Sequence, residues 1–175
     1  SLFEEKVSKL FHKSCLMFNS GFDANSGILQ VLGGKETLFL ADKLIHASMI
    51  DGIKGSGAKF MRFAHNDIEH LETLIVKYQE KFKEIIIITE AVFSMDGDFA
   101  PLNKLVLLKE KYPLIKLYVD EAHSFGVYGK SGLGLCCKLN ILDKVDYILC
   151  TLGKAAGSCG AFFLCDAMPK EYLIN

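Results

Sequence analysis

The sequence predicts an α/β domain in which helices flank a largely parallel sheet. Strand-like apolar runs alternate with helical segments along the 175 residues, and repeated β-α-β passages build parallel sheets with right-handed crossovers. Residues 85–89 are all β-branched and do not alternate with polar positions, as expected of a strand buried on both faces. Half of the residues are hydrophobic, so a single domain can bury a sizeable core.

The elements of the first third of the chain follow from local signals. An amphipathic, charged start predicts a helix, and the Ser20-Gly21 turn leads into the next one. The expected elements are a helix at 2–12, a strand at 15–19, a helix at 23–32, a strand at 37–40, a helix at 47–55 and a strand at 59–63.

A capping-box pattern marks the helix that follows. Asn66 precedes Glu69 by three residues, and this spacing allows each side chain to cap the other's backbone N–H. Apolar residues then recur at helical spacing, at Leu71, Leu74, Ile75 and Tyr78.

Prolines frame the last well-marked helix. Pro101 suits a first helical turn, and Pro113 ends the same helix. Four strands are expected in the second half, at residues 85–89, 116–119, 147–150 and 161–165. Residues 169–175 have the pattern of another helix start.

Composition excludes several classes of function. A formal net charge of −1 does not suit electrostatic wrapping of nucleic acid. No apolar run reaches the roughly 18 residues of a membrane helix, and the first ten residues lack the pattern of a signal peptide. The six cysteines form no CxxC pair and indicate reduced thiols in a cytoplasmic protein.

Chemically useful residues gather where predicted strands end. In open α/β sheets, ligands bind at the carboxyl ends of the strands. Five candidates stand shortly after predicted strands: Gly21, Ser94, Asp120, His123 and Lys154.

Lys154 is the most informative of these residues. It lies in a loop of small residues, 151–160, between two apolar runs at the mouth of the predicted sheet. A lysine that is desolvated there has a lowered pKa, and its neutral amine can form a Schiff base. The simpler alternative is a solvated lysine in a glycine-rich loop.

The other candidates suit a ligand that carries an aldehyde, a pyridine nitrogen and a phosphate. Asp120 can pair with a protonated ring nitrogen, which makes the ring an electron sink, as pyridoxal phosphate chemistry requires. His123 can reach the phenolic oxygen, and His46 can lie against the ring. Thr151 and the backbone of the turn 20–22 suit the phosphate.

Each of these assignments has a structural alternative. Asp120 and His123 can form a local hydrogen-bonded turn, and His46 can be a residue at a helix start. Gly21 can simply turn the chain, and Ser94 can cap a loop.

The sequence predicts no metal site. His65 precedes the expected helix cap, and His70 is expected on a solvated helix face. Asp96 and Asp98 stand in what is more simply a tight turn. The adjacent cysteines 136 and 137 lack further zinc ligands, and the glycine-rich stretch 129–134 lacks the Lys-Ser/Thr of a P-loop.

Six segments together resemble the α-oxoamine synthase family of fold-type-I pyridoxal-phosphate enzymes. They are NSGFDAN at 19–25, ADKLIHAS at 41–48, RFAHND at 62–67, TEAVFSMDGD at 89–98, VDEAH at 119–123 and TLGKAAGSCG at 151–160. The fold that this resemblance implies is the family's large cofactor-binding domain, a three-layer α/β/α arrangement with a mostly parallel sheet.

The resemblance also implies roles for individual residues. Lys154 would bind the cofactor aldehyde and then move a substrate proton, while Asp120 holds the pyridine nitrogen and His46 stacks on the ring. His123 and Ser94 would serve the phenolic oxygen. The phosphate region would fall to Gly21, Phe22 and Thr151.

The implied reaction is a decarboxylating condensation of an amino acid with an acyl-CoA, with pyridoxal 5'-phosphate as cofactor. The family builds its site at a homodimer interface, so a homodimer is expected. Residues 1–175 would be one large catalytic domain, a fragment without the family's N-terminal substrate-binding segment and its C-terminal small domain with a carboxylate-binding arginine.

Two other classes of function remain open from the sequence. One is a cofactor-free enzyme that forms a Schiff base through Lys154, in which Asp120 would lack a purpose. The other is a non-catalytic scaffold subunit; the retained lysine and aspartate do not favour it.

Overall fold

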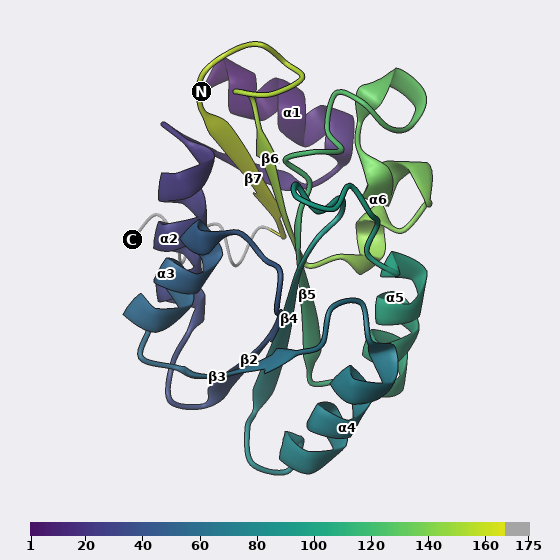
Figure 1. Cartoon of the computed structure of the whole chain (residues 1–175). Helices are drawn as coiled ribbons and strands as arrows, with labels where there is room; N and C mark the ends of the chain where they lie inside the picture. The colour runs from purple at the N-terminus through teal and green to yellow at the C-terminus, as the bar shows by residue number, and fades with distance from the viewer. Residues whose placement is uncertain (167–175) are drawn as a thin grey trace.

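The computed structural model describes residues 1–166 of the chain. The helix start expected at residues 169–175 lies outside this part. Within it, seven strands form one sheet in the order β1-β7-β6-β5-β4-β2-β3 (Figure 1). The strands are β1 Ser14–Phe18, β2 Thr37–Asp42, β3 Lys59–Phe63, β4 Glu84–Glu90, β5 Ile115–Asp120, β6 Tyr147–Thr151 and β7 Ala161–Cys165.

Helices cover both faces of this sheet, so the expected α/β class with a mostly parallel sheet is confirmed. Figure 1 shows α2 and α3 on one side and α4 and α5 on the other. The helices are α1 Leu2–Phe11, α2 Gly21–Leu32, α3 Ala47–Gly55, α4 Ile68–Tyr78, α5 Leu102–Lys111 and α6 Leu135–Lys138. Two short 3₁₀ turns, Lys130–Gly132 and Leu142–Lys144, flank α6. In the described residues, no helix has the length and hydropathy to cross a bilayer.

The direction of the strands decides where the site forms. β7 pairs antiparallel with both β1 and β6, whereas the pairs β6–β5, β5–β4, β4–β2 and β2–β3 are parallel. β7 is therefore the one reversed strand in the described part of the sheet. The other six strands end at the same edge, and the loops that follow them meet there.

The core lies in the middle of the sheet. Ile85, Ile86, Ile87 and Ile88 of β4 are each 0% exposed, as the unalternating pattern predicts for a strand covered on both faces. Full burial of such a side chain stabilises the fold by roughly 1.5–3 kcal/mol. This rigid centre holds the strand ends in fixed positions.

The predicted capping box at α4 is wrong. Asp67 is the N-cap, and its carboxylate accepts a hydrogen bond from the His70 N–H at 2.8 Å. Asn66 instead takes a left-handed conformation with φ 55°, which asparagine tolerates better than most residues. Its amide donates to an Asp98 carboxylate oxygen at 2.9 Å. Asn66 therefore holds the loop that contains Asp98 and does not cap the helix.

His65 joins three segments at the carboxyl edge of the sheet. Its Nδ1 lies 2.9 Å from an Asp42 carboxylate oxygen, and its Nε2 lies 2.7 Å from an Asp98 oxygen. Among the described residues, His65, Asp96 and Asp98 place possible ligand atoms within 4.8 Å of one another. Because carboxylates already engage both ring nitrogens, the arrangement favours an ion-pair cluster over a metal site.

Candidate active site

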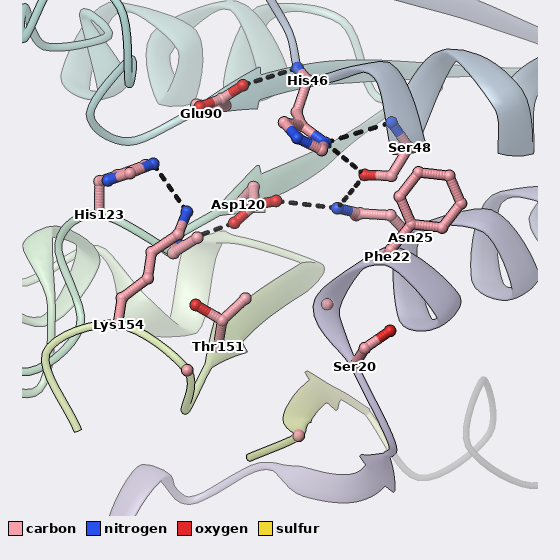
Figure 2. Close-up of a pocket in the computed structure, with 14 residues that line it drawn as sticks. Ser20, Phe22, Asn25, His46, Ser48, Glu90, Asp120, His123, Thr151 and Lys154 are labelled. Atoms are coloured by element: carbon pink, nitrogen blue, oxygen red, sulfur yellow. Dashed lines mark hydrogen bonds between the residues drawn. The ribbon is translucent and has the colours of Figure 1, made fainter. Parts of the chain in front are cut away.

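A cavity of about 270 Å³ opens at the edge where the parallel strands end (Figure 2). This volume is near the lower end of the roughly 300–1,000 Å³ of ligand pockets. Its lining residues are Ser20, Gly21, Phe22, Asn25, His46, Ser48, Glu90, Asp120, Ala122, His123, Thr151, Gly153, Lys154 and Gly160. All but one of the site residues expected from the sequence are in this set.

Asp120 forms part of the buried floor of the cavity. It is the last residue of β5 and is only 5% exposed. One carboxylate oxygen accepts a hydrogen bond from the Ala122 N–H at 2.8 Å, and the other accepts one from the Asn25 amide at 2.9 Å. Two fixed donors therefore hold this carboxylate in one orientation.

His46 also lines the cavity, at the start of α3. Its Nδ1 lies 2.8 Å from the Ser48 hydroxyl and accepts a hydrogen bond from the Ser48 N–H at 3.2 Å. A backbone N–H can only donate, so the neutral ring carries its proton on Nε2. The His46 backbone N–H in turn donates to Glu90 at 2.7 Å.

Glu90 brings a second buried carboxyl group to the site. It ends β4 and is 4% exposed. Burial, and then the negative charge of Asp120, raise the pKa of Glu90 to about 7. This group therefore changes its charge near neutral pH.

Lys154 meets His123 at the mouth of the cavity, where its Nζ lies 2.7 Å from the histidine Nε2. Burial, and then the charge of Lys154, lower the pKa of His123. A neutral imidazole can accept a hydrogen bond from the amine.

The expected desolvation of Lys154 is not found, because this side chain is exposed. The loop between β6 and β7 is a closed hairpin end, in which the Leu152 N–H donates to the Gly160 carbonyl and the Ser158 N–H to the Leu152 carbonyl, both at 2.9 Å. These hydrogen bonds close the loop on itself, and its lysine stays uncovered.

The first turn of α2 forms another wall. Ser20 caps this helix by accepting a hydrogen bond from the Asp23 N–H at 3.0 Å. A Cβ on Gly21 would lie 2.5 Å from Cγ2 of Thr151, so the close approach of α2 to β6 requires glycine. The Thr151 hydroxyl is buried without a hydrogen-bond partner in the part of the chain that the structure describes.

Ser94 is the expected site residue that does not line the cavity. After β4, the chain forms an isolated bridge between Val92 and Phe99. Within the turn between them, the Phe93 N–H donates to the Asp98 carbonyl at 3.0 Å. Ser94 lies in this turn and is exposed.

Glu121 fixes the loop that carries His123. It is 1% exposed, and its carboxylate accepts hydrogen bonds from the Ser124 hydroxyl, the Leu135 N–H at 2.8 Å and the Cys136 N–H at 2.6 Å. Burial raises the pKa of Glu121. The carboxyl group thus joins the end of β5 to the start of α6, behind the site.

Sequence reasoning missed Asn25, Ser48 and Glu90. Asn25 and Ser48 are 2% and 1% exposed. They end two of the segments that carry the family resemblance, but their residue types alone do not distinguish them from surface polar residues of a helix. Glu90 gave a usable signal, since an acidic residue directly after a β-branched strand falls at the edge where ligands bind.

The chain belongs to the aminotransferase class I and II family, whose profile matches residues 1–175. This is a family of pyridoxal-phosphate-dependent enzymes, and the resemblance to the α-oxoamine synthases is confirmed. One relative is a Glaesserella parasuis protein provisionally named 8-amino-7-oxononanoate synthase, which is 51% identical over 99% of this chain and 46% of its own length.

Solved structures agree with this assignment. The 8-amino-7-oxononanoate synthase of Francisella tularensis matches with a TM-score of 0.81 at 37% identity, over 99% of this chain and 49% of that one. A variant of serine palmitoyltransferase from S. paucimobilis, solved with a bound PLP–myriocin aldimine, matches with a TM-score of 0.90 at 29% identity, over 97% of this chain and 44% of that one. The chain thus spans less than half the length of each of these three relatives.

Proposed function

We propose that this chain forms the cofactor-binding part of an enzyme that condenses an amino acid with an acyl-CoA and releases carbon dioxide. The favoured reaction joins L-alanine to a pimeloyl thioester and yields 8-amino-7-oxononanoate, free CoA and carbon dioxide, as in biotin biosynthesis. One observation carries this proposal. A buried carboxylate, Asp120, and an amine, Lys154, line the same cavity in a chain that is 51% identical to a provisionally named 8-amino-7-oxononanoate synthase.

The cavity fits pyridoxal 5'-phosphate at both ends. Thr151 presents a buried hydroxyl without a protein partner in residues 1–166, which suits a phosphate oxygen. The first N–H groups of α2, at Gly21 and Phe22, have no partners within the helix and favour an anion. At the other end, the doubly held carboxylate of Asp120 suits a protonated ring nitrogen.

The cofactor, when bound, supplies an aldehyde and an electron-withdrawing ring that stabilises a carbanion. Asp120 would hold the protonated ring nitrogen through its negative charge. Lys154 would hold the cofactor aldehyde through Nζ, and its amine would serve as the base for the α-proton of the substrate. His46 would pack against the ring face, and its Nε2–H is available to orient the acyl group.

His123 keeps a hydrogen-bond acceptor next to the reacting amine. Its Nε2 lies 2.7 Å from the Lys154 Nζ, and its lowered pKa favours the neutral ring. The neutral ring adds no second positive charge next to the amine, so it can take part in proton transfer to and from Nζ.

We further propose that a second copy of the chain completes the site in a cytoplasmic homodimer. Phe22 is 49% exposed although it lines the cavity, and Lys154 is exposed at the mouth. Both features suit a cavity that another protein surface closes. The proposed function involves no metal and no nucleic acid.

A CoA-release assay on the full-length protein tests the reaction. Pimeloyl-, acetyl-, succinyl- and palmitoyl-CoA are each combined with alanine, glycine and serine, and free thiol is measured. We expect the fastest release with pimeloyl-CoA and alanine. Preference for acetyl- or succinyl-CoA with glycine indicates 2-amino-3-ketobutyrate CoA ligase or 5-aminolevulinate synthase activity instead. No release with any pair, in protein that binds the cofactor, indicates a scaffold role.

A further inference from the structure

A chain of buried polar groups lies beneath the cavity floor and centres on Asn25. The Tyr118 hydroxyl donates to Asn25 Oδ1 at 2.7 Å. The amide nitrogen of Asn25 donates to Asp120 Oδ2 at 2.9 Å and to the Ser48 hydroxyl at 3.1 Å. Figure 2 shows Asn25 between these last two side chains, and Ser48 continues the chain to His46.

Every hydrogen bond among these buried polar groups has a fixed direction. Asp120 accepts from Asn25, so the nitrogen of the amide faces Asp120 and its oxygen faces Tyr118. The two amide protons go to Asp120 and to Ser48. Flipping the amide would place its oxygen against a carboxylate, in a site where Asn25 is 2% exposed, and this is strongly unfavourable. The Asn25 side chain is therefore locked.

The position of Asn25 on α2 connects its fixed side chain to the proposed phosphate site. Gly21 and Asn25 are four residues apart, so they lie on the same face of the helix, separated by about 6 Å along its axis. Gly21 begins the wall proposed for the phosphate, whereas Asn25 holds the carboxylate proposed for the ring nitrogen. One helical turn thus ties the two ends of the cavity together.

We propose that Asn25 is a positioning residue that fixes Asp120 Oδ2 in the orientation needed to bind the cofactor ring nitrogen. This inference rests on the proposed function, since it takes Asp120 as the partner of that nitrogen. Asn25 does not touch the ring and acts through the carboxylate. Without the amide, the carboxylate keeps its hydrogen bond from the Ala122 N–H at 2.8 Å and turns about that single contact.

The test compares binding of two probes to the full-length protein. Pyridoxal phosphate and its 1-deaza analogue differ only at the ring nitrogen, so the ratio of their dissociation constants reports the Asp120 contact. We expect the wild type to prefer pyridoxal phosphate. In Asn25→Leu, the ratio of the two dissociation constants is expected to show a preference that is at least tenfold smaller. A general loss of structure weakens both probes equally and leaves the ratio unchanged.

Ser48→Ala is the matched control, because Ser48 accepts the other proton of the same amide. Its ratio is expected to stay within twofold of the wild type. An Asn25→Leu ratio equal to that of the wild type overturns the inference. If Asn25→Leu fails to fold, Asn25→Ser, which is too short to span both partners, serves in the same assay with the same expected loss.

A crystal structure of the cofactor-free Asn25 variant supplies a readout without ligand. The carboxylate of Asp120 is expected to rotate away from its wild-type orientation while the Ala122 contact persists, and an unmoved carboxylate contradicts the inference. If the wild type does not distinguish the two probes, the proposed role of Asp120 fails, yet this crystal structure still decides whether Asn25 orients the carboxylate.

Discussion

At the scale of a residue, the ionisation of Glu90 makes the stability of the protein depend on pH. Its carboxyl is buried next to Asp120, and its pKa rises from 4.5 to about 7. Between these two values the folded state binds the proton more tightly than the unfolded state. Stability therefore falls as pH rises through this window, and it stays lower above pH 7.

Glu90→Gln is expected to remove this dependence. Glutamine keeps an oxygen for the His46 N–H but cannot ionise, so the variant should be more stable than the wild type at pH 8, by about 1–3 kcal/mol. The two proteins should be similar at pH 5. Urea unfolding of the full-length protein at both pH values measures the difference. The exposed Glu69→Gln is the control, and an equal change at both pH values in Glu90→Gln contradicts the account.

Individual site residues could be predicted where their chemistry is unusual for their place in the sequence. Asp120, His123 and Lys154 follow apolar strands, so their position at the sheet edge could be expected. Asn25 and Ser48 could not, because their role arises from the packing of α2 against α3 and the sheet. Ser94 also follows a strand, but it lies in an exposed turn and is not among the residues that line the cavity.

At the scale of an element, α2 is fixed by one close contact at its first residue. A Cβ at Gly21 would meet Cγ2 of Thr151 at 2.5 Å, whereas a Cβ at Gly27, also on α2, would meet nothing within 4 Å. Gly21→Ala is expected to destabilise the protein by about 1–3 kcal/mol and to weaken pyridoxal phosphate binding. Gly27→Ala should instead stabilise it by about 0.5–1 kcal/mol.

Thermal unfolding and cofactor titration of both variants measure these effects. Equal behaviour of the two alanine variants contradicts the proposed contact between α2 and β6.

The long elements could be predicted because burial imposes clear patterns on them. The isoleucines of β4 and the helical spacing of Leu71 to Tyr78 are examples. The capping residue of α4 could not be predicted, because Asn66 and Asp67 are both good capping residues and only the left-handed backbone at Asn66 decides between them. Short turns such as Lys130–Gly132 have too few residues for a periodic signal.

At the scale of the whole molecule, His65 links segments that are far apart in sequence. Burial alone lowers the pKa of His65, but the hydrogen bonds to Asp42 and Asp98 outweigh it and raise the pKa above 6.5. The stabilisation from the charged ring is therefore complete below pH 6.5 and is lost as pH rises through the raised pKa.

His65→Gln is expected to lose more stability at pH 6 than at pH 9, because only the charged ring pairs with both carboxylates. The matched control is His70→Gln, since His70 is exposed and its ring accepts one hydrogen bond, from the Ala64 N–H. Unfolding midpoints at the two pH values check this expectation. The His65 ring also packs edge-to-face on Phe93, with the ring centroids 4.5 Å apart. A pH-independent loss in His65→Gln would show that the ring acts through this packing alone.

Reductive trapping of the cofactor on the full-length protein is the most direct test of the central claim that Lys154 and Asp120 hold pyridoxal phosphate between them. The loaded protein is treated with borohydride, digested and analysed by mass spectrometry. We expect the pyridoxyl phosphate mass on the peptide that contains Lys154, and none on the corresponding peptide of Lys154→Ala. Cofactor fixed to a different lysine, or no fixed cofactor in the wild type, contradicts the account.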